Sequence, residues 1–396
     1  MMRHRTSVIV AGGGVVGATT ALVLAEAGRQ VMLVEPREPQ PWSPEAAPDL
    51  RVYAVAPASI TLFEALGVWR DVLAARAAPY CDMRVWDAGA DGELHFRAAD
   101  IGAATLGHIV EQNVLLEALW RRLREHPRVE CRTGVGVAGF EQRENGIAVA
   151  VDDEHLEVEL LVASDGAASP LREQAGIAVE STDYGQRGLV AYVECDQPHQ
   201  HTAWQRFLSD GPLAFLPFED SRCSIVWTQS SAEAERRLQL DEAAFNAEIT
   251  RAFDARLGEV RLVSRRAAFP LRRQLAERFV DGRLLLIGDA AHTVHPLAGQ
   301  GANLGLQDAA LLMRLFKDAG EQPTSKQWKR LLMRYARERR SESAIAGRAF
   351  GGINALFSND QPLMTLLRGP GLGLVSHIAP LRSLLAKHAA GYSAQP

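Results

Sequence analysis

A glycine-rich turn between two strand-like runs constrains the fold of this chain more than any other feature. The stretch SVIVAGGGVVGATTALVLAEAGRQVMLVE contains a β-branched strand at 7–10, a helix rich in Ala and Leu, and a second strand that ends at Glu35. Between strand and helix lie Gly12, Gly14 and Gly17, in the spacing GxGxxG. The first glycine permits a tight turn, the second lets the backbone approach a pyrophosphate, and the third allows close helix–strand packing. The unit predicts an α/β fold that binds an adenine dinucleotide, with Glu35 placed to accept hydrogen bonds from ribose.

A second strand that ends in a turn lies in LEVELLVASDGAASPLREQAG. Asp165-Gly166 alone would favour a β-hairpin, because Asp-Gly is a common hairpin turn. The Ser169-Pro170 pair that follows is typical of a helix N-cap and first turn instead. We therefore predict a strand-to-helix turn at Asp165 and Gly166.

A third turn of this shape lies in LLLIGDAAHTVHPLAGQGANLGLQDAALL. A buried strand is predicted at Leu284–Ile287, and it stops at Asp289, whose side chain would project from the strand's carboxyl end, where α/β folds bind ligands. The helix predicted after Gly299-Gln300-Gly301 would present free backbone N–H groups and its dipole to a ligand that develops negative charge. His292 and His295 lack an HExxH pattern and a third ligand, so we predict no metal.

Composition excludes several classes of function. The 396 residues suffice for two domains, or for one large fold with an insert, and the net charge of −5 gives no reason to expect nucleic acid. No uncharged apolar run reaches 18 residues, so no membrane span is expected. The four cysteines form no CxxC pair, which argues against zinc or a disulfide framework and favours a reducing compartment. We interpret RYARERR, residues 334–340, as a solvated helix face.

An aromatic segment between the second and third turns, TAWQRFLSDGPLAFLPFEDSRCSIVWTQ, shows the alternation of antiparallel strands around EDSR. It is a candidate substrate-binding sheet inserted into the dinucleotide domain. Aromatic residues on a sheet also build its core, so both roles stay open for the candidate substrate residues, which are Trp204, Phe215, Pro217 and Trp227.

These motifs, in this order and at these separations, resemble the flavin-dependent aromatic hydroxylases similar to p-hydroxybenzoate hydroxylase. The whole chain is most similar to their ubiquinone-biosynthesis branch. The resemblance implies a Rossmann-like FAD-binding domain, an inserted antiparallel substrate sheet and a helical C-terminus. The implied segments are 1–75, 100–175 and 277–345 for the FAD-binding domain, 76–99 and 180–276 for the sheet, and 346–396 for the C-terminal segment.

The resemblance also implies roles for individual residues. The block GDAAHTVHPLAGQGANLGLQDA is its most specific part, and a loop beside the isoalloxazine ring is implied to act in catalysis through Pro296, Gly299, Gln300 and Gly301. Glu111 and Gln112 are both candidates for one polar flavin contact, and the choice stays open. The implied FAD contacts are Gly12, Gly14, Gly17, Glu35, Arg51, Gln112, Asp165, Gly166, Asp289, Gly301 and Asn303, with Asp165 and Gly166 shared with the reduced nicotinamide.

The implied activity is hydroxylation of an aromatic ring with NADPH or NADH and dioxygen, through a flavin C4a-hydroperoxide. The cofactor carries the oxygen chemistry, which explains why the chain shows no nucleophile of its own. A polyprenyl phenol of ubiquinone biosynthesis is the implied substrate. The alternatives are a hydroxylase of a small soluble phenol and a flavoprotein reductase without oxygen insertion. Because there is no second GxGxxG, we expect the nicotinamide to bind transiently.

The sequence after Arg340 mixes apolar residues with Arg368, Arg382 and Lys387, interrupted by Gly and Pro. This composition predicts short amphipathic helices. They could cover the core of the FAD-binding domain or contact a membrane surface or a biosynthetic complex, and both options stay open. We expect a cytoplasmic protein, with peripheral contact at the inner membrane surface as the alternative.

Overall fold

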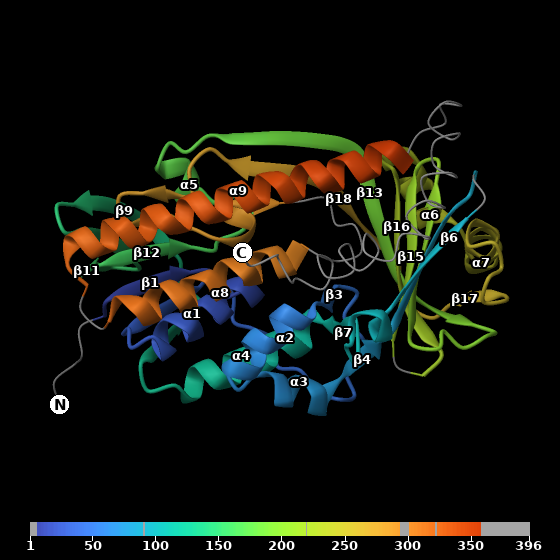
Figure 1. Ribbon diagram of the computed structural model, residues 1–396, viewed down its shortest axis with the longest axis horizontal. Helices are drawn as coiled ribbons and strands as arrows, with labels where there is room; N and C mark the ends of the chain where they lie inside the picture. Colours follow the sequence, from blue (N-terminus) through green and yellow to red (C-terminus); the bar gives the residue numbers. More distant parts are fainter. Residues whose placement is uncertain (1–5, 90–91, 219, 294–300, 321–322, 358–396) are drawn as a thin grey trace.

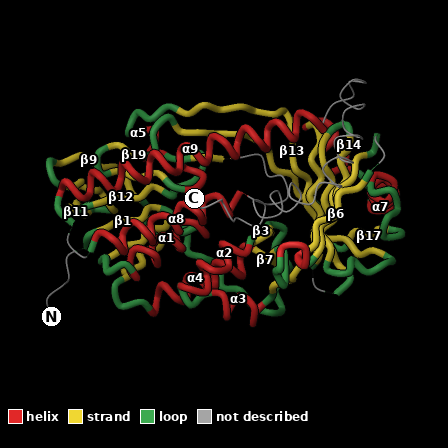
Figure 2. The backbone as a smooth tube through the Cα atoms, viewed as in Figure 1, coloured by secondary structure: helices red, strands yellow, loops and turns green. Residues whose placement is uncertain are grey.

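The computed structural model describes residues 6–89, 92–218, 220–293, 301–320 and 323–357, with side chains given up to residue 345 in the last range. The molecule is elongated (Figure 1). A parallel sheet with its covering helices occupies one end, and a large antiparallel sheet occupies the other. Figure 2 shows strands of the large sheet extending along the upper edge of the molecule toward the parallel sheet.

The first sheet has six strands in the order β19-β20-β12-β1-β2-β8, and all neighbours are parallel except β19 and β20. Its centre, VIVA in β1, is fully buried on both faces, as expected for a β-branched run in a parallel sheet. Helices α1, α4, α8 and α9 contribute to the same hydrophobic core. The strands are β1 (Val8–Ala11), β2 (Val31–Glu35), β8 (Val129–Thr133), β12 (Leu160–Ala163), β19 (Val280–Asp281) and β20 (Leu284–Leu286). The helices are α1 (Val15–Glu26), α4 (Gln112–Glu125), α8 (Gly301–Ala319) and α9 (Ser325–Phe357).

The two βα turns predicted from sequence are confirmed. β1 leads through the glycine turn into α1, and β2 ends at Glu35. After β12 the chain enters α5 (Pro170–Gln174), whose N-cap Ser169 accepts a hydrogen bond from the backbone N–H of Arg172 at 3.1 Å. The Ser-Pro signal therefore outweighs the hairpin tendency of Asp-Gly.

Two three-stranded sheets extend this half of the molecule. One is a meander in the order β11-β10-β9, and the other has the order β3-β7-β4 and lies between the parallel sheet and the large sheet (Figure 1). Their strands are β3 (Val52–Val55), β4 (Ala77–Tyr80), β7 (Gly107–Glu111), β9 (Val137–Arg143), β10 (Gly146–Val151) and β11 (Glu154–Val158). Helices α2 (Pro57–Ala65) and α3 (Trp69–Ala75) connect β3 to β4, and η1 (Ala98–Ile101) precedes β7.

The large sheet has nine strands, in the order β21-β18-β13-β16-β15-β14-β5-β6 with β17 beside β13. Its pairs are antiparallel except β5 with β14. The predicted hairpin is confirmed as β15 and β16, and helices α6 (Ser231–Gln239) and α7 (Glu242–Ala252) add Ala234, Phe245 and Ile249 as buried residues. The strands are β5 (Asp82–Asp87), β6 (Glu93–Arg97), β13 (Val179–Cys195), β14 (Thr202–Leu208), β15 (Gly211–Pro217), β16 (Arg222–Ser230), β17 (Val260–Leu262), β18 (Ala267–Ala276) and β21 (His292–Thr293).

The exact division into domain segments stays a prediction. Within the described ranges, no helix is both long enough and apolar enough to cross a membrane. The same residues hold no group of three His, Cys, Asp or Glu side chains arranged to bind a metal ion. Residues 358–396, on which the prediction of short C-terminal helices falls, lie outside the described residues.

Candidate functional site

In the glycine turn before α1, neighbouring backbone atoms crowd two of the three glycines, whereas the third has open space among the described residues. Gly12 has a φ of 103°, and a Cβ there would lie 2.4 Å from the carbonyl oxygen of Ser164. A Cβ at Gly17 would lie 1.9 Å from the carbonyl oxygen of Gly12. At Gly14, the N-cap of α1, an added Cβ would have no protein atom within 4 Å among the described residues. The described residues therefore leave space beside position 14, as a bound pyrophosphate would require.

Glu35 lies directly against this turn. Its Oε2 accepts a hydrogen bond from the backbone N–H of Gly13 at 2.5 Å, and its Oε1 accepts one from Arg37 at 3.0 Å. Trp120 on α4 donates from Nε1 to the Gly13 carbonyl at 2.9 Å, which fixes the turn from the other side. Glu35, the residue predicted to contact ribose, is thus held at the end of β2, next to Gly13.

The second predicted motif meets the glycine turn in space. Ser164 donates from Oγ to the carbonyl oxygens of Ala11 and Gly12, both at 2.8 Å. Asp165 accepts one hydrogen bond, from Leu171 N to Oδ2 at 3.3 Å, while its buried Oδ1 has no partner among the described residues. A buried carboxylate oxygen without a donor costs free energy, so this atom is a candidate acceptor for a ligand hydroxyl or amide.

The third motif packs against the start of α1. A Cβ at Gly305 on α8 would lie 2.6 Å from Val16 Cγ2, and one at Gly288 would lie 3.1 Å from Val16 Cγ1. The two glycines therefore let α8 and the turn after β20 approach α1 closely. Three motifs separated by more than a hundred residues of sequence are brought to the carboxyl ends of β1 and its neighbours, where α/β sheets bind ligands.

Three of the predicted contact residues gather around Tyr53 on β3. Tyr53 donates from its hydroxyl to Gln112 Oε1 at 2.6 Å, and the backbone N–H of Gln112 donates to the Arg51 carbonyl at 2.9 Å. Burial, opposed by the charge of Arg51 and supported by nearby Asp289 and Asp49, raises the pKa of Tyr53 to about 12. Tyr53 was not predicted from sequence, and its only signal is its place two residues after Arg51.

Asp289 follows β20 within the short helix η2 (Gly288–Ala290). Its side chain reaches the surface, yet the surrounding protein removes enough water to raise its pKa, against the lowering effect of His292 and Arg51. The proximity of Arg51 to both Asp289 and Tyr53 places the start of β3 and the third motif at one site. A ligand that donates hydrogen bonds would stabilise the charged form of Asp289.

The hydrogen bonds of Glu111 and Gln112 favour Gln112 as the candidate for the polar flavin contact. Glu111 is fully buried and accepts hydrogen bonds from Arg76 Nε at 2.6 Å and from Asp49 N at 2.6 Å. Burial raises the pKa of Glu111, against the lowering effect of the Asp49 N–H and of Arg76. Glu111 therefore anchors the segment that leads into Arg51, while Gln112 lies beside Tyr53.

The side chain of Asn303 is fully used within the protein. Its Oδ1 accepts hydrogen bonds from Ala56 N at 3.0 Å and Ser59 Oγ at 2.8 Å, and its Nδ2 donates to the Ala54 carbonyl at 2.7 Å. This side chain therefore ties α8 to the junction of β3 and α2. The contact between Asn303 and a cofactor stays a prediction. Such a contact would use the backbone N–H groups at the start of α8, because the side chain is already bonded.

Gly301 begins α8, and a Cβ added there would meet open space among the described residues. Its predicted partners Pro296, Gly299 and Gln300 lie outside the described residues, as does His295. Their roles stay predictions.

A buried ion-pair network supports the third motif and was not predicted from sequence. Asp308 on α8, fully buried, accepts hydrogen bonds from Gly288 N at 2.8 Å, His292 Nε2 at 2.8 Å and Arg339 Nε at 2.5 Å. Burial alone would raise the pKa of Asp308, but the charges of His292 and Arg339 and these hydrogen bonds outweigh it and lower the pKa. The network fixes the turn that carries Asp289.

This network corrects one interpretation of the basic stretch at 334–340. Arg334, Arg337 and Arg340 are exposed, as a solvated face requires, but Arg339 is only 2% exposed and reaches Asp308. The position of Tyr335, whose hydroxyl donates to the Leu286 carbonyl at 3.1 Å, shows the same face of α9 turned toward the parallel sheet.

The aromatic candidates for substrate contact pack on the face of the large sheet that α7 covers. Trp204, Phe215 and Trp227 belong to a cluster with residues of α7, and the ring of Phe215 stacks on Phe253 with centroids 3.7 Å apart. Pro217 shares this face by the two-residue period of β15. This packing is that of core residues, and a contact of these four with substrate stays a prediction.

The opposite face of the sheet turns toward β3 and β7. There, side chains of the large sheet form one apolar cluster with Leu50, Ala54 and Ile109, close to Arg51 and Tyr53. This cluster places an apolar surface beside the predicted site. Its members from the sheet are Tyr192, Ala203, Ala214, Leu216 and Phe218, with Val190, Val226 and Ala267 partly buried against them.

Comparisons with known proteins agree with this geometry. Residues 5–346 match a family model described as "FAD binding domain". The chain is 35% identical to the 3-demethoxyubiquinol 3-hydroxylase of Escherichia coli (strain K12), over 99% of this chain and 100% of that protein. It is also 35% identical to the ubiquinone hydroxylase UbiL of Rhodospirillum rubrum, over 97% of this chain and 89% of that protein.

Solved structures share the fold at lower identity. The p-nitrophenol 4-monooxygenase PnpA from Pseudomonas putida DLL-E4 superposes with a TM-score of 0.79 at 19% identity, covering 99% of both chains. PqsL of P. aeruginosa, in complex with 2-aminobenzoylacetate, superposes with a TM-score of 0.76 at 21% identity, covering 92% of this chain and 100% of that one.

Proposed function

The chain belongs to the FAD-binding-domain family of flavin-dependent hydroxylases, and from this premise we propose that it hydroxylates the ring of a polyprenylated phenol in ubiquinone biosynthesis. The observation that carries the proposal is the full-length similarity to two proteins named as ubiquinone hydroxylases. NADPH or NADH is the electron donor. A small soluble phenol is the second candidate substrate, because the solved relatives include a p-nitrophenol monooxygenase.

The residues present fit FAD. The unpartnered Oδ1 of Asp165 offers an acceptor, and the free space at Gly14 leaves room for a pyrophosphate at the N-terminus of α1. Glu35 would hold the ribose and Asp289 the ribityl chain. When bound, FAD supplies the transfer of electrons to dioxygen and the insertion of oxygen into the ring.

The chain's own part is to bind, orient and keep water out. Backbone N–H groups at the start of α8 have no intrahelical partners, and with the helix dipole they stabilise negative charge on a reduced ring system. The apolar cluster around Tyr192 and Ala214 would cover the substrate side and exclude water, which protects a reactive intermediate.

Replacing Asp289 by alanine is expected to weaken FAD binding without unfolding the protein. The change removes charge-assisted hydrogen bonds to the ribityl chain worth about 1.5–3 kcal/mol, which corresponds to about tenfold or more in affinity. Flavin fluorescence titration of the apoprotein measures the effect. Asp289→Asn keeps the size and one acceptor, so its affinity should fall between wild type and Asp289→Ala. Unchanged affinity in Asp289→Ala would remove Asp289 from the site.

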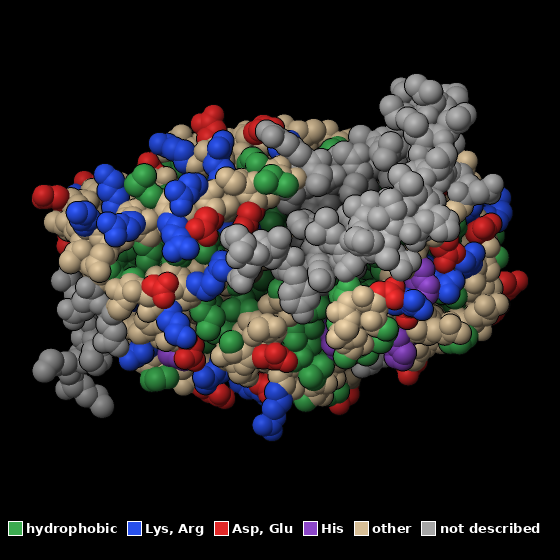
Figure 3. Space-filling model, in the orientation of Figure 1, with side chains coloured by type: hydrophobic (Ala, Val, Ile, Leu, Met, Phe, Trp, Pro, Cys, Tyr) green, Lys and Arg blue, Asp and Glu red, His purple; other side chains and the backbone are tan. Residues whose placement is uncertain are grey.

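A polyprenyl substrate resides in a bilayer, so the proposal includes contact with an anionic membrane surface. On α9 the side chains of Lys326, Lys329, Arg330, Arg334 and Arg337 are exposed, together with Met333 at 62% exposed. Figure 3 shows Lys and Arg side chains gathered over the region where Figure 1 draws α9. A helix face of this kind is attracted to anionic lipid.

Substrate class and membrane contact can be tested in one assay of NAD(P)H oxidation. We expect a prenylated phenol in phosphatidylglycerol vesicles to stimulate oxidation with little peroxide released, because a filled pocket excludes water. The same phenol in phosphatidylcholine vesicles should require a higher concentration. Tight coupling with an unprenylated phenol and no response to the prenylated one would favour the soluble substrate. Equal responses in both kinds of vesicle would contradict the contact with an anionic membrane surface and would leave the proposed substrate class standing.

A further inference from the structure

A polar pocket lies on the large sheet, away from the FAD site. It has a volume of about 540 Å³, which is within the usual range of small-molecule sites, and it opens between β5, β6, β14 and the loop after α7. Trp86 and Arg206 line it from directly opposite positions on β5 and β14. Trp86 belongs to the cluster that contains Phe215 and Phe253, so the pocket is on the α7 side of the sheet. The FAD site lies toward the other face.

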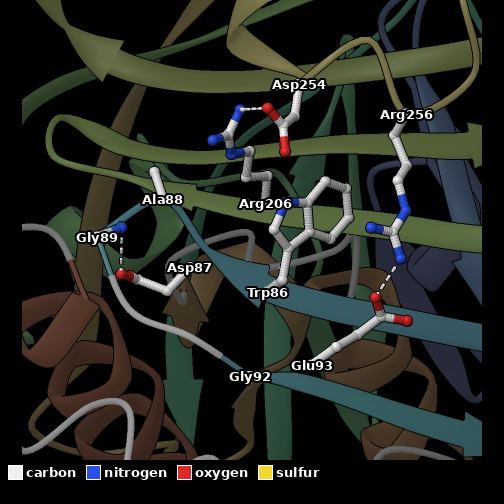
Figure 4. A pocket seen from close by; sticks show the side chains of 9 residues that line it. All are labelled: Trp86, Asp87, Ala88, Gly89, Gly92, Glu93, Arg206, Asp254 and Arg256. Carbon is white, nitrogen blue, oxygen red and sulfur yellow. Dashed lines mark hydrogen bonds and ion pairs between the residues drawn. The ribbon is translucent and has the colours of Figure 1, made fainter.

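Two N–H donors in this pocket have no acceptor among the described residues. One is Nε1 of Trp86, whose side chain is 7% exposed, and the other is Nε of Arg206. Arg206 uses Nη1 for the Ala252 carbonyl at 3.0 Å, and this Nη1 lies 3.9 Å from Asp254. Figure 4 shows the indole of Trp86 between Arg206 and Arg256. Buried donors without acceptors are rare in folded proteins, so both N–H groups are candidate donors to an oxygen of a bound ligand.

The charges around the pocket are balanced. Glu93 is paired with Arg256 and, at 3.1 Å, with Arg84, while Asp254 and Asp87 stand near Arg206 and Gly89. Three guanidinium groups and three carboxylates thus lie in or beside the pocket. A dianion would be repelled by the carboxylates, whereas a single carboxylate can accept from both free donors and place its hydrocarbon part against the indole.

We propose that this pocket is a second ligand site that binds a small organic carboxylate through Trp86 Nε1 and Arg206 Nε. The site is independent of FAD and of the hydroxylation proposed above. The balanced ion pairs hold the arginines in place, so the pocket is formed before the ligand arrives.

The test uses the FAD-loaded full-length protein with nitrogen-15-labelled tryptophan. Trp86→Phe identifies the indole N–H signal of Trp86, and this signal is followed while propionate or inorganic phosphate is added at constant ionic strength. Propionate should move the signal saturably. Arg206→Met should raise the half-saturating concentration at least about tenfold, because a charge-assisted hydrogen bond is lost. Arg206→Lys keeps the charge without Nε, so it should weaken binding in a protein that still folds.

Arg265→Met, at an exposed position outside the pocket, is the matched control and should bind propionate as wild type does. FAD content and melting temperature of each variant show whether the fold is intact. The proposal is overturned if propionate causes no saturable change, which would mean that water alone fills the pocket. It is also overturned if folded Arg206→Lys binds as tightly as wild type, or if phosphate binds more tightly than propionate.

Discussion

The Gly14→Val protein is expected to fold and to purify with less than about a tenth of the normal FAD content. Among the described residues, no protein atom lies within 4 Å of the position where the new Cβ would stand, and the φ of −64° and ψ of 177° suit an extended valine. The fold loses only the N-cap preference of glycine over valine, about 1 kcal/mol or less. The pyrophosphate, in contrast, must approach the backbone at this residue, and the valine side chain blocks it. FAD per chain, measured from the absorbance spectrum after gel filtration, gives the result.

Gly17→Ala separates this effect from damage to the fold. Its methyl group would stand 1.9 Å from the Gly12 carbonyl oxygen and 2.4 Å from Ser164 Oγ, so β1 and α1 must move apart. We expect this variant to lower the melting temperature of the apoprotein, whereas Gly14→Val should leave it nearly unchanged. Normal flavin occupancy in Gly14→Val would show that the pyrophosphate does not lie at this turn.

Asp308→Ala should cause the largest loss of stability among single substitutions near the site. It leaves Arg339, 2% exposed, without its buried partner, and breaking such a pair costs about 3–5 kcal/mol. For a chain of this length unfolding as one unit, the melting temperature should fall by about 4–6 °C. Asp318→Ala, at an exposed position on the same helix, should change stability by less than about 0.5 kcal/mol. Equal effects of the two substitutions would contradict the network.

The same carboxylate predicts how stability depends on pH. Because the pKa of Asp308 is lowered in the folded state, its contribution is complete above the unfolded pKa of about 3.9 and is lost as the pH falls through the folded value. The difference in free energy of unfolding between wild type and Asp308→Ala should therefore be largest near neutral pH and should shrink in acid. Urea unfolding at several pH values measures it.

Local patterns in the sequence carried much of the fold. The spacing of Gly12, Gly14 and Gly17 and the Ser169-Pro170 signal each depend on neighbours a few residues away, so both βα turns could be predicted. The alternation around EDSR likewise predicted the β15–β16 hairpin, because register in a hairpin follows from the turn.

Contacts between distant segments were beyond the sequence. Trp204, Phe215 and Trp227 lie on three different strands, so only the pairing register puts them on one face, and only the position of α7 shows that this face is covered by a helix. In the sequence, Asp308 and Arg339 look like ordinary charged helix residues. Their pairing is visible only once α8 and α9 are packed against each other. No local pattern showed that the side chain of Asn303 would bond to Ala54 and Ala56 at the junction of β3 and α2, and its predicted cofactor contact stays a prediction.

Aromatic hydroxylation is the central claim, and product analysis under isotope-labelled dioxygen tests it most directly. The FAD-loaded protein is given NAD(P)H and a prenylated phenol in vesicles, and the product is examined by mass spectrometry. We predict a phenol with one added oxygen atom that carries the label, formed in proportion to the NAD(P)H consumed. The claim would be contradicted if both prenylated and unprenylated phenols stayed unchanged while one hydrogen peroxide formed for each NAD(P)H consumed. The protein would then be a flavoprotein reductase without oxygen insertion.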